Sequence, residues 1–328
     1  MESSPNTGLS GRLGDRVDQP KFNRLAVPPF AALTAAALTI LQPLLARIFG
    51  IAAWSGSFTQ KPEGTWHIGL TMMVWYTAVA VMGGALLARH ITQRTSVRCA
   101  EFCKAALWAA AGALFAFPVI AALASGADVP HVTWPGLSMA ASVPIGAVLG
   151  VAATWLAIHY SAVRIGVGIS VAWVWLLGFV SVVMSWGDDV RQSVPLGAAT
   201  VGGPPKDAAP IDHTLHESTV SILKMVSIAG PILIACALLW WARQNARSVS
   251  EAITAGLAGP LFILASYLVR PNALDGANLD WFQFSLRIVG LALLAAAATW
   301  VIAVVWWSRK LSSEGPSPLL NIKIAEKR

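Results

Sequence analysis

The chain has 328 residues, of which 56% are hydrophobic and only 12% are charged, and its formal net charge is +7. Soluble globular domains carry about 25% charged residues, so this composition excludes an ordinary soluble domain and indicates a membrane protein. The positive charge does not predict a nucleic-acid partner, because the sequence contains no recognition module. Basic segments are instead expected to contact membrane lipids.

The N-terminal segment, residues 1–24, is polar and rich in Ser, Gly and Asp. It lacks the short apolar core and small-residue cleavage site of a secretory signal. We therefore predict a disordered cytoplasmic tail for these residues.

Eight apolar runs follow within residues 25–308, which we predict to form the transmembrane domain. A bilayer core about 30 Å thick requires about 20 apolar residues per helix. The runs are approximately 28–48, 68–87, 105–123, 137–158, 165–184, 220–241, 252–269 and 288–307. They are apolar on all sides rather than alternating, which favours helices over strands. The predicted fold class is all-α, a polytopic helical bundle with about eight transmembrane helices.

The distribution of Lys and Arg predicts the orientation of these helices. Sixteen of the 23 basic residues fall on the side that holds both termini, and seven fall on the other. The positive-inside rule therefore places both termini, including the tail 309–328, in the cytoplasm, and the long loop 185–219 outside. Because the Ala, Val, Leu and Trp usage is similar to that of bacterial proteins from GC-rich genomes, we predict a multi-pass protein of the bacterial plasma membrane.

Tryptophans cluster near the ends of the predicted spans. Nine of the 15 lie there, including Trp54, Trp66 and Trp134. We interpret them as the aromatic belt of a membrane protein.

Carboxylates and histidines are missing from the middle of every predicted span. Proton-coupled transport usually needs such groups, and a membrane haem needs axial ligands at depth. The sequence also lacks an HExxH metalloprotease motif, a Walker loop, the paired aspartates of prenyl transfer and a GxSG loop. No catalytic residue is assigned, and no cofactor is predicted.

A polar stripe descends the sixth predicted span. His213, Glu217, Ser221, Lys224 and Ser227 follow one another at steps of four, four, three and three, so they share one helix face. Lys224 lies four residues inside the apolar run. Its ammonium either snorkels to the headgroups, pairs with Glu217, or faces the bundle interior.

The third alternative predicts a ligand-binding vestibule on the outer side. Its candidate residues are Lys224, Arg287, Glu217, Ser221 and Asp280. A divalent metal is an additional hypothesis for the stripe, since His213, His216 and Glu217 have helical ligand spacing, but no metal site is assigned.

Small residues and prolines mark positions where helices approach or bend. Gly146 and Gly150 form a GxxxG pattern that predicts either packing within the bundle or contact with a protein partner or a second copy. Pro118, Pro144, Pro231 and Pro260 interrupt four spans. Each of these prolines either lines a cavity or is simply tolerated in its helix.

No motif of a known family is present, so function rests on these features alone. The leading hypothesis is a permease-like protein or transporter component with an outward-facing polar vestibule. The alternative is a non-catalytic scaffold or partner subunit of cell-envelope, secretion or signalling machinery. A lipid-modifying membrane enzyme comes third, and whether the protein is an enzyme at all stays open.

Overall fold

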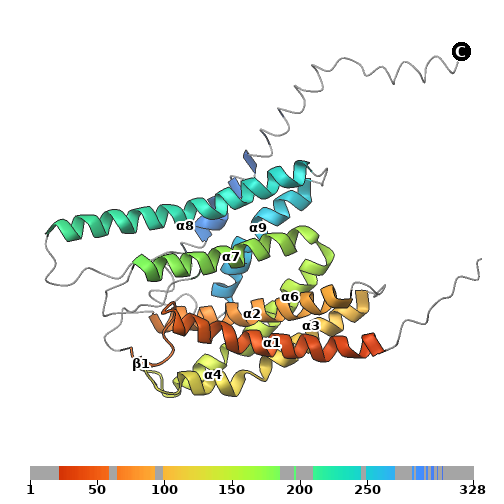
Figure 1. The fold of residues 1–328 in the computed structure, drawn as a ribbon. Coiled ribbons are helices and arrows are strands. Elements are labelled where there is room, and N and C mark those ends of the chain that lie inside the picture. The colour runs from red at the N-terminus through yellow and green to blue at the C-terminus, as the bar shows by residue number, and fades with distance from the viewer. Residues whose placement is uncertain are drawn as a thin grey trace, which may run out of the picture.

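The computed structural model of the chain is almost entirely helical in the part it describes (Figure 1). That part comprises residues 22–58, 65–92, 99–184, 196, 210–244 and 249–269, with scattered positions between 283 and 305. Helices make up 86% of it, which confirms the predicted all-α class. A short parallel bridge joins β1 (Gly56–Ser57) to β2 (Ala127–Asp128).

Five helical stretches are long and apolar enough to cross a bilayer. They are α1 (Phe22–Ile48), α2 (Thr65–Thr92), α3 with α4 (Cys99–Leu114 and Phe117–Ala124), α5 with α6 (Pro135–Ala140 and Ser142–His159), and α7 (Ser161–Met184). These coincide with the first five predicted spans, and by length and composition they are compatible with a multi-pass membrane protein.

Two further helices follow, α8 (Pro210–Gln244) and α9 (Val249–Leu268). Their described apolar stretches, Met225–Leu238 and Ile253–Leu268, are shorter. Half of the eighth predicted span, the tail 309–328 and residues 1–21 of the predicted tail 1–24 lie outside the described residues. The total of about eight spans and the cytoplasmic position of the termini therefore stay predictions. The prediction of a disordered tail is wrong for residues 22–24, because α1 already begins at Phe22.

The helices form two groups that lie one above the other in Figure 1. In the first group α2 packs against α1, α3 and α6, and in the second α9 packs against α7 and α8. Contacts of α6 with α7 and of α2 with α9 join the groups. Other helices surround α2, so 78% of the residues in its apolar stretch are buried. In the apolar stretch of α1 the buried share is 33%.

Small residues allow the helices of the first group to approach closely. A Cβ added to Gly150 of α6 would lie 2.8 Å from the Ala78 carbonyl oxygen of α2, and one on Gly146 would lie 2.7 Å from Thr77 Cβ. The GxxxG pattern therefore packs within the bundle, against α2 of the same chain. A protein partner or a homo-oligomer stays a prediction, but the Gly146/Gly150 face is already covered.

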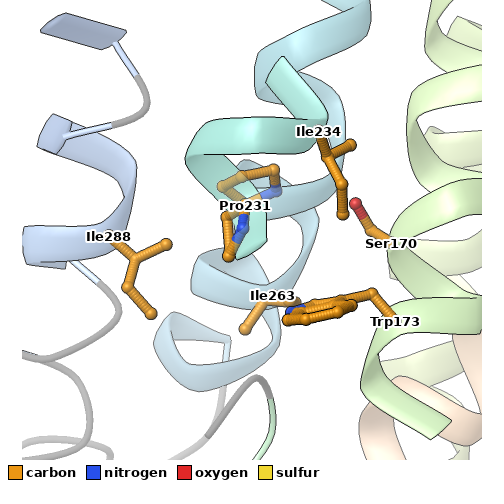
Figure 2. A pocket seen from close by; sticks show the side chains of 7 residues that line it. Ser170, Trp173, Pro231, Ile234, Ile263 and Ile288 are labelled. Atoms are coloured by element: carbon orange, nitrogen blue, oxygen red, sulfur yellow. The ribbon is translucent and has the colours of Figure 1, made fainter. Parts of the chain in front are cut away.

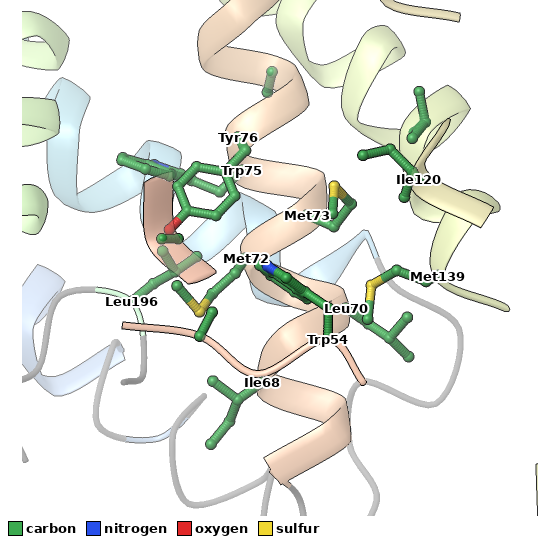
Figure 3. Close-up of a cluster of buried hydrophobic side chains, with 14 of the residues drawn as sticks. Trp54, Ile68, Leu70, Met72, Met73, Trp75, Tyr76, Ile120, Met139 and Leu196 are labelled. Atoms are coloured by element: carbon green, nitrogen blue, oxygen red, sulfur yellow. The ribbon is translucent and has the colours of Figure 1, made fainter. Parts of the chain in front are cut away.

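Buried polar side chains add specific links between the helices and their connections. Gln42 in α1 donates to the Tyr76 carbonyl oxygen of α2 at 3.2 Å. The indole of Trp54, 1% exposed, donates to the Pro43 carbonyl oxygen at 2.9 Å and lies in the core shown in Figure 3. Trp66 is also buried, so these two tryptophans are core residues, whereas Trp134 is 72% exposed as expected of a belt residue.

Two of the four prolines mark the start of a new helix rather than a bend within one. Pro118 is the second residue of α4, which begins after a turn at Phe115–Ala116. Pro144 is the third residue of α6, which begins after Ala141. The first turn of a helix has unpaired N–H groups in any case, so neither proline removes a helical hydrogen bond. Both are exposed, and neither lines the cavity that contains Pro231 and Pro260 or the pocket around Tyr76.

We predict that Gly146→Ala destabilises the fold by about 1–3 kcal/mol, because the new methyl group meets the α2 backbone. The measurement is the thermal unfolding midpoint of the detergent-purified protein. Gly168→Ala is the matched control, since a Cβ there has nothing within 4 Å. Equal midpoints for the two variants would contradict close α2–α6 packing.

Candidate functional site

The polar stripe of α8 ends at Ser227, on the face by which this helix packs against the other helices. Ser227, Pro231, Ala235 and Leu238 are buried and follow one another at steps of four, four and three. The other described member of the stripe, Ser221, is exposed. Ser227 is therefore the point at which the stripe enters the packed interior.

The opposite face of α8 is apolar and exposed. Ile222, Met225 and Leu233 are 61%, 69% and 67% exposed, as expected of side chains that face lipid. At about 100° per residue, positions 213, 217 and 224 fall within about 40° of Pro231 around the helix axis. These positions thus share the register of the packed face.

The remaining predicted site residues are described unevenly. For His213, His216, Glu217 and Lys224 the structure describes the backbone within α8 but not the side chain. Asp280 lies outside the described residues. Arg287 is exposed, and its neighbour Ile288 is buried at 6% exposure. The gathering of these side chains into one vestibule therefore stays a prediction.

A cavity lies where α7, α8 and α9 meet, at the inner end of the stripe (Figure 2). Its volume is about 20 Å³, room for one water-sized group. The lining residues are Ser170, Trp173, Pro231, Ile234, Pro260, Ile263 and Ile288. Two of the four prolines, Pro231 and Pro260, therefore line the same cavity as Ile288, the residue that follows Arg287.

Two polar side chains of α7 reach the cavity. Figure 2 shows Ser170 and Trp173 extending from α7 toward Pro231. Trp173 Nε1 is shielded from solvent, and no hydrogen-bond acceptor lies within its reach in the part of the chain that the structure describes. Such a donor costs about 1–3 kcal/mol when it stays unpaired.

Glycines hold these two side chains in place. The Trp173 indole packs directly on Gly230 of α8, where an added Cβ would lie 2.7 Å from Cη2 and closer to Cε2, the atom bonded to Nε1. The Ser170 hydroxyl occupies the space that a side chain at Gly259 of α9 would take. Larger residues at either glycine would therefore displace the polar groups of the cavity.

The prolines of the cavity lie inside their helices, unlike Pro118 and Pro144. Pro260 has no N–H with which to bond the Gly256 carbonyl oxygen one turn earlier. Pro231 interrupts α8 in the same way. For these two positions the structure confirms the cavity-lining interpretation.

An aromatic pocket separates the two helix groups. Tyr76 of α2 lies 5.4 Å from Trp75 and 5.8 Å from Trp175 of α7, measured between ring centroids. Leu196, from the predicted external loop, is 1% exposed and is one of the residues that line this pocket (Figure 3). Tyr267 of α9 donates to the Leu196 carbonyl oxygen at 3.4 Å.

Metal binding has no support among the described side chains, since no three His, Cys, Asp or Glu residues gather there. The side chains of His213, His216 and Glu217 are not among those described. The metal hypothesis for the stripe therefore stays a prediction.

Sequence reasoning missed Ser170, Trp173 and Leu196. Ser170 and Trp173 are three residues apart and share a helix face in an apolar span. This spacing was the feature of the sequence that could have identified them. The sequence gives no comparable indication for Leu196, because a single leucine in a loop rich in Gly and Pro does not predict burial.

Comparison of the chain with protein-family models, with curated proteins and with solved structures gives no match.

We predict that Leu196→Ala lowers the free energy of unfolding by about 2–5 kcal/mol, because it removes a fully buried side chain between the helix groups. Tyr267→Phe should cost about 1 kcal/mol or less, since its hydrogen bond is long. Denaturation of both variants in detergent measures the difference. A larger loss for Tyr267→Phe would mean that the hydrogen bond, rather than apolar insertion, holds Leu196.

Proposed function

We propose that this multi-pass protein is a permease-like membrane protein or transporter component, with a polar path that enters along α8. The path begins at the predicted outer end of α8, passes positions 217 and 224, and ends at the cavity of Ser170 and Trp173. Lys224 and Arg287 would then attract a solute in an outward-facing vestibule.

The observation that carries the proposal is the register of α8. By helical spacing, positions 213, 217 and 224 share the register of the buried residues Ser227 and Pro231, whereas Ser221 is exposed and apolar side chains cover the opposite face. A snorkelling lysine needs no such register, because it can reach the headgroups from a lipid-facing position. A lysine on the packed face instead requires water or polar partners inside the bundle.

The cavity agrees with this path. Transporters commonly bind solutes at helices interrupted near the middle of the bilayer, where backbone hydrogen bonds are missing. Pro231 and Pro260 provide two such interruptions around one cavity. Because the cavity has room for only one water-sized group, the proposal requires it to widen when a solute binds.

Cysteine labelling tests the path. Lys224→Cys is placed in a background without Cys99, Cys103 and Cys236, and intact cells are treated with a membrane-impermeant maleimide. We expect Cys at 224 to react about tenfold or more faster than Cys at 222, because an apolar environment raises the pKa of a thiol and the reaction needs the thiolate.

Ile222→Cys is a demanding control. Position 222 is about 3 Å nearer the outer end of α8 than position 224, but it lies on the exposed apolar face. If depth alone governed access, position 222 would react faster. Equal or faster labelling at 222 contradicts the proposal, and so does the absence of reaction at both positions.

A further inference from the structure

Trp173 is one of the residues that line the cavity between α7, α8 and α9, which has room for one water-sized group. Its indole Nε1 is buried and has no hydrogen-bond partner among the described residues. Unpaired buried donors in native structures usually indicate a bound water, ion or ligand atom. The Ser170 hydroxyl lines the same space and can supply a second hydrogen bond.

The chemistry of the lining selects the kind of atom that fits. An indole N–H donates only, and a serine hydroxyl donates or accepts. The other lining residues are Pro231, Ile234, Pro260, Ile263 and Ile288, all apolar. An oxygen acceptor would satisfy the Trp173 donor, whereas a cation would meet no carboxylate among these residues.

Two cationic positions outside the cavity, on the predicted outer side, favour an anionic solute. Arg287 directly precedes the lining residue Ile288. Lys224 precedes Pro231 by two turns, about 10.5 Å along the axis, on the same face by register. Both cationic positions lie toward the same predicted outer side, so an anion approaching along α8 would pass them first.

We propose that Trp173 and Ser170 form a binding site for one carboxylate oxygen of a small organic anion. This inference rests on the proposed function, since it names the solute class of the same path. The Trp173 N–H and the Ser170 hydroxyl donate to the oxygen, and the apolar residues exclude water around it. The rest of the solute lies toward the vestibule.

Thermal stabilisation of the full-length, detergent-purified protein tests the site. The probe is sodium acetate, compared with sodium chloride at equal ionic strength, with acetamide and with tetramethylammonium chloride. We expect acetate, at about ten times its dissociation constant, to raise the unfolding midpoint by about 2–4 °C more than chloride does. Trp173→Phe, which keeps an aromatic ring but removes the N–H, should abolish this shift.

Trp66→Phe is the matched control. Trp66 Nε1 is likewise buried without a partner among the described residues, but Trp66 does not line the cavity. This variant should keep the acetate shift. If Trp173→Phe fails to fold, Ser170→Ala provides the second test and should weaken the shift.

Several outcomes would overturn the inference. These are no acetate shift in the wild type, an equal shift in Trp173→Phe, or a larger shift with acetamide or tetramethylammonium than with acetate. The labelling experiment at position 224 is independent of this result. A reactive position 224 without acetate stabilisation removes only the carboxylate site, whereas acetate stabilisation without labelling removes the aqueous path.

Discussion

The close approach of helix backbones is the constraint on which the rest of the structure depends. Lipid tails are as apolar as leucine, so helices in a bilayer gain little from burying apolar surface against one another. They gain instead from dense packing, which requires small residues at the contacts. Gly84 against α1, Gly150 against α2, and Gly256 against Ala235 of α8 provide such contacts in both helix groups. The abundance of Gly and Ala is thus an architectural requirement.

The same close packing determines where polar groups can lie. At Gly230 and Gly259 the missing side chains leave room for Trp173 and Ser170 of α7, so a tight three-helix contact contains two polar side chains. Pro231 and Pro260 interrupt α8 and α9 beside them. Pro118 and Pro144 are also found in apolar spans but occupy first turns, where a proline disturbs nothing. The function of each proline therefore follows from its place in a helix.

The joint between the two helix groups is built differently from their interiors. It is aromatic and includes Tyr76, Trp175 and the inserted side chain of Leu196. Aromatic rings bury large apolar areas and prefer tilted or edge-to-face contacts. Large side chains therefore hold this boundary, in place of the close backbone approach that glycine permits within each group.

The sequence by itself determined the class of the protein, the positions of five apolar helices and the spacing of the α8 stripe. These properties are local, because they depend on hydrophobic length and on 3.6 residues per turn. Only the tertiary structure decided that Gly146 and Gly150 face α2, that Trp54 is a core residue, and that Ser170 and Trp173 share a cavity with Pro231 and Pro260. Each of these facts is a contact between segments distant in the chain, and apolar helices that are hydrophobic on every side carry no periodic signal of which neighbour they will meet.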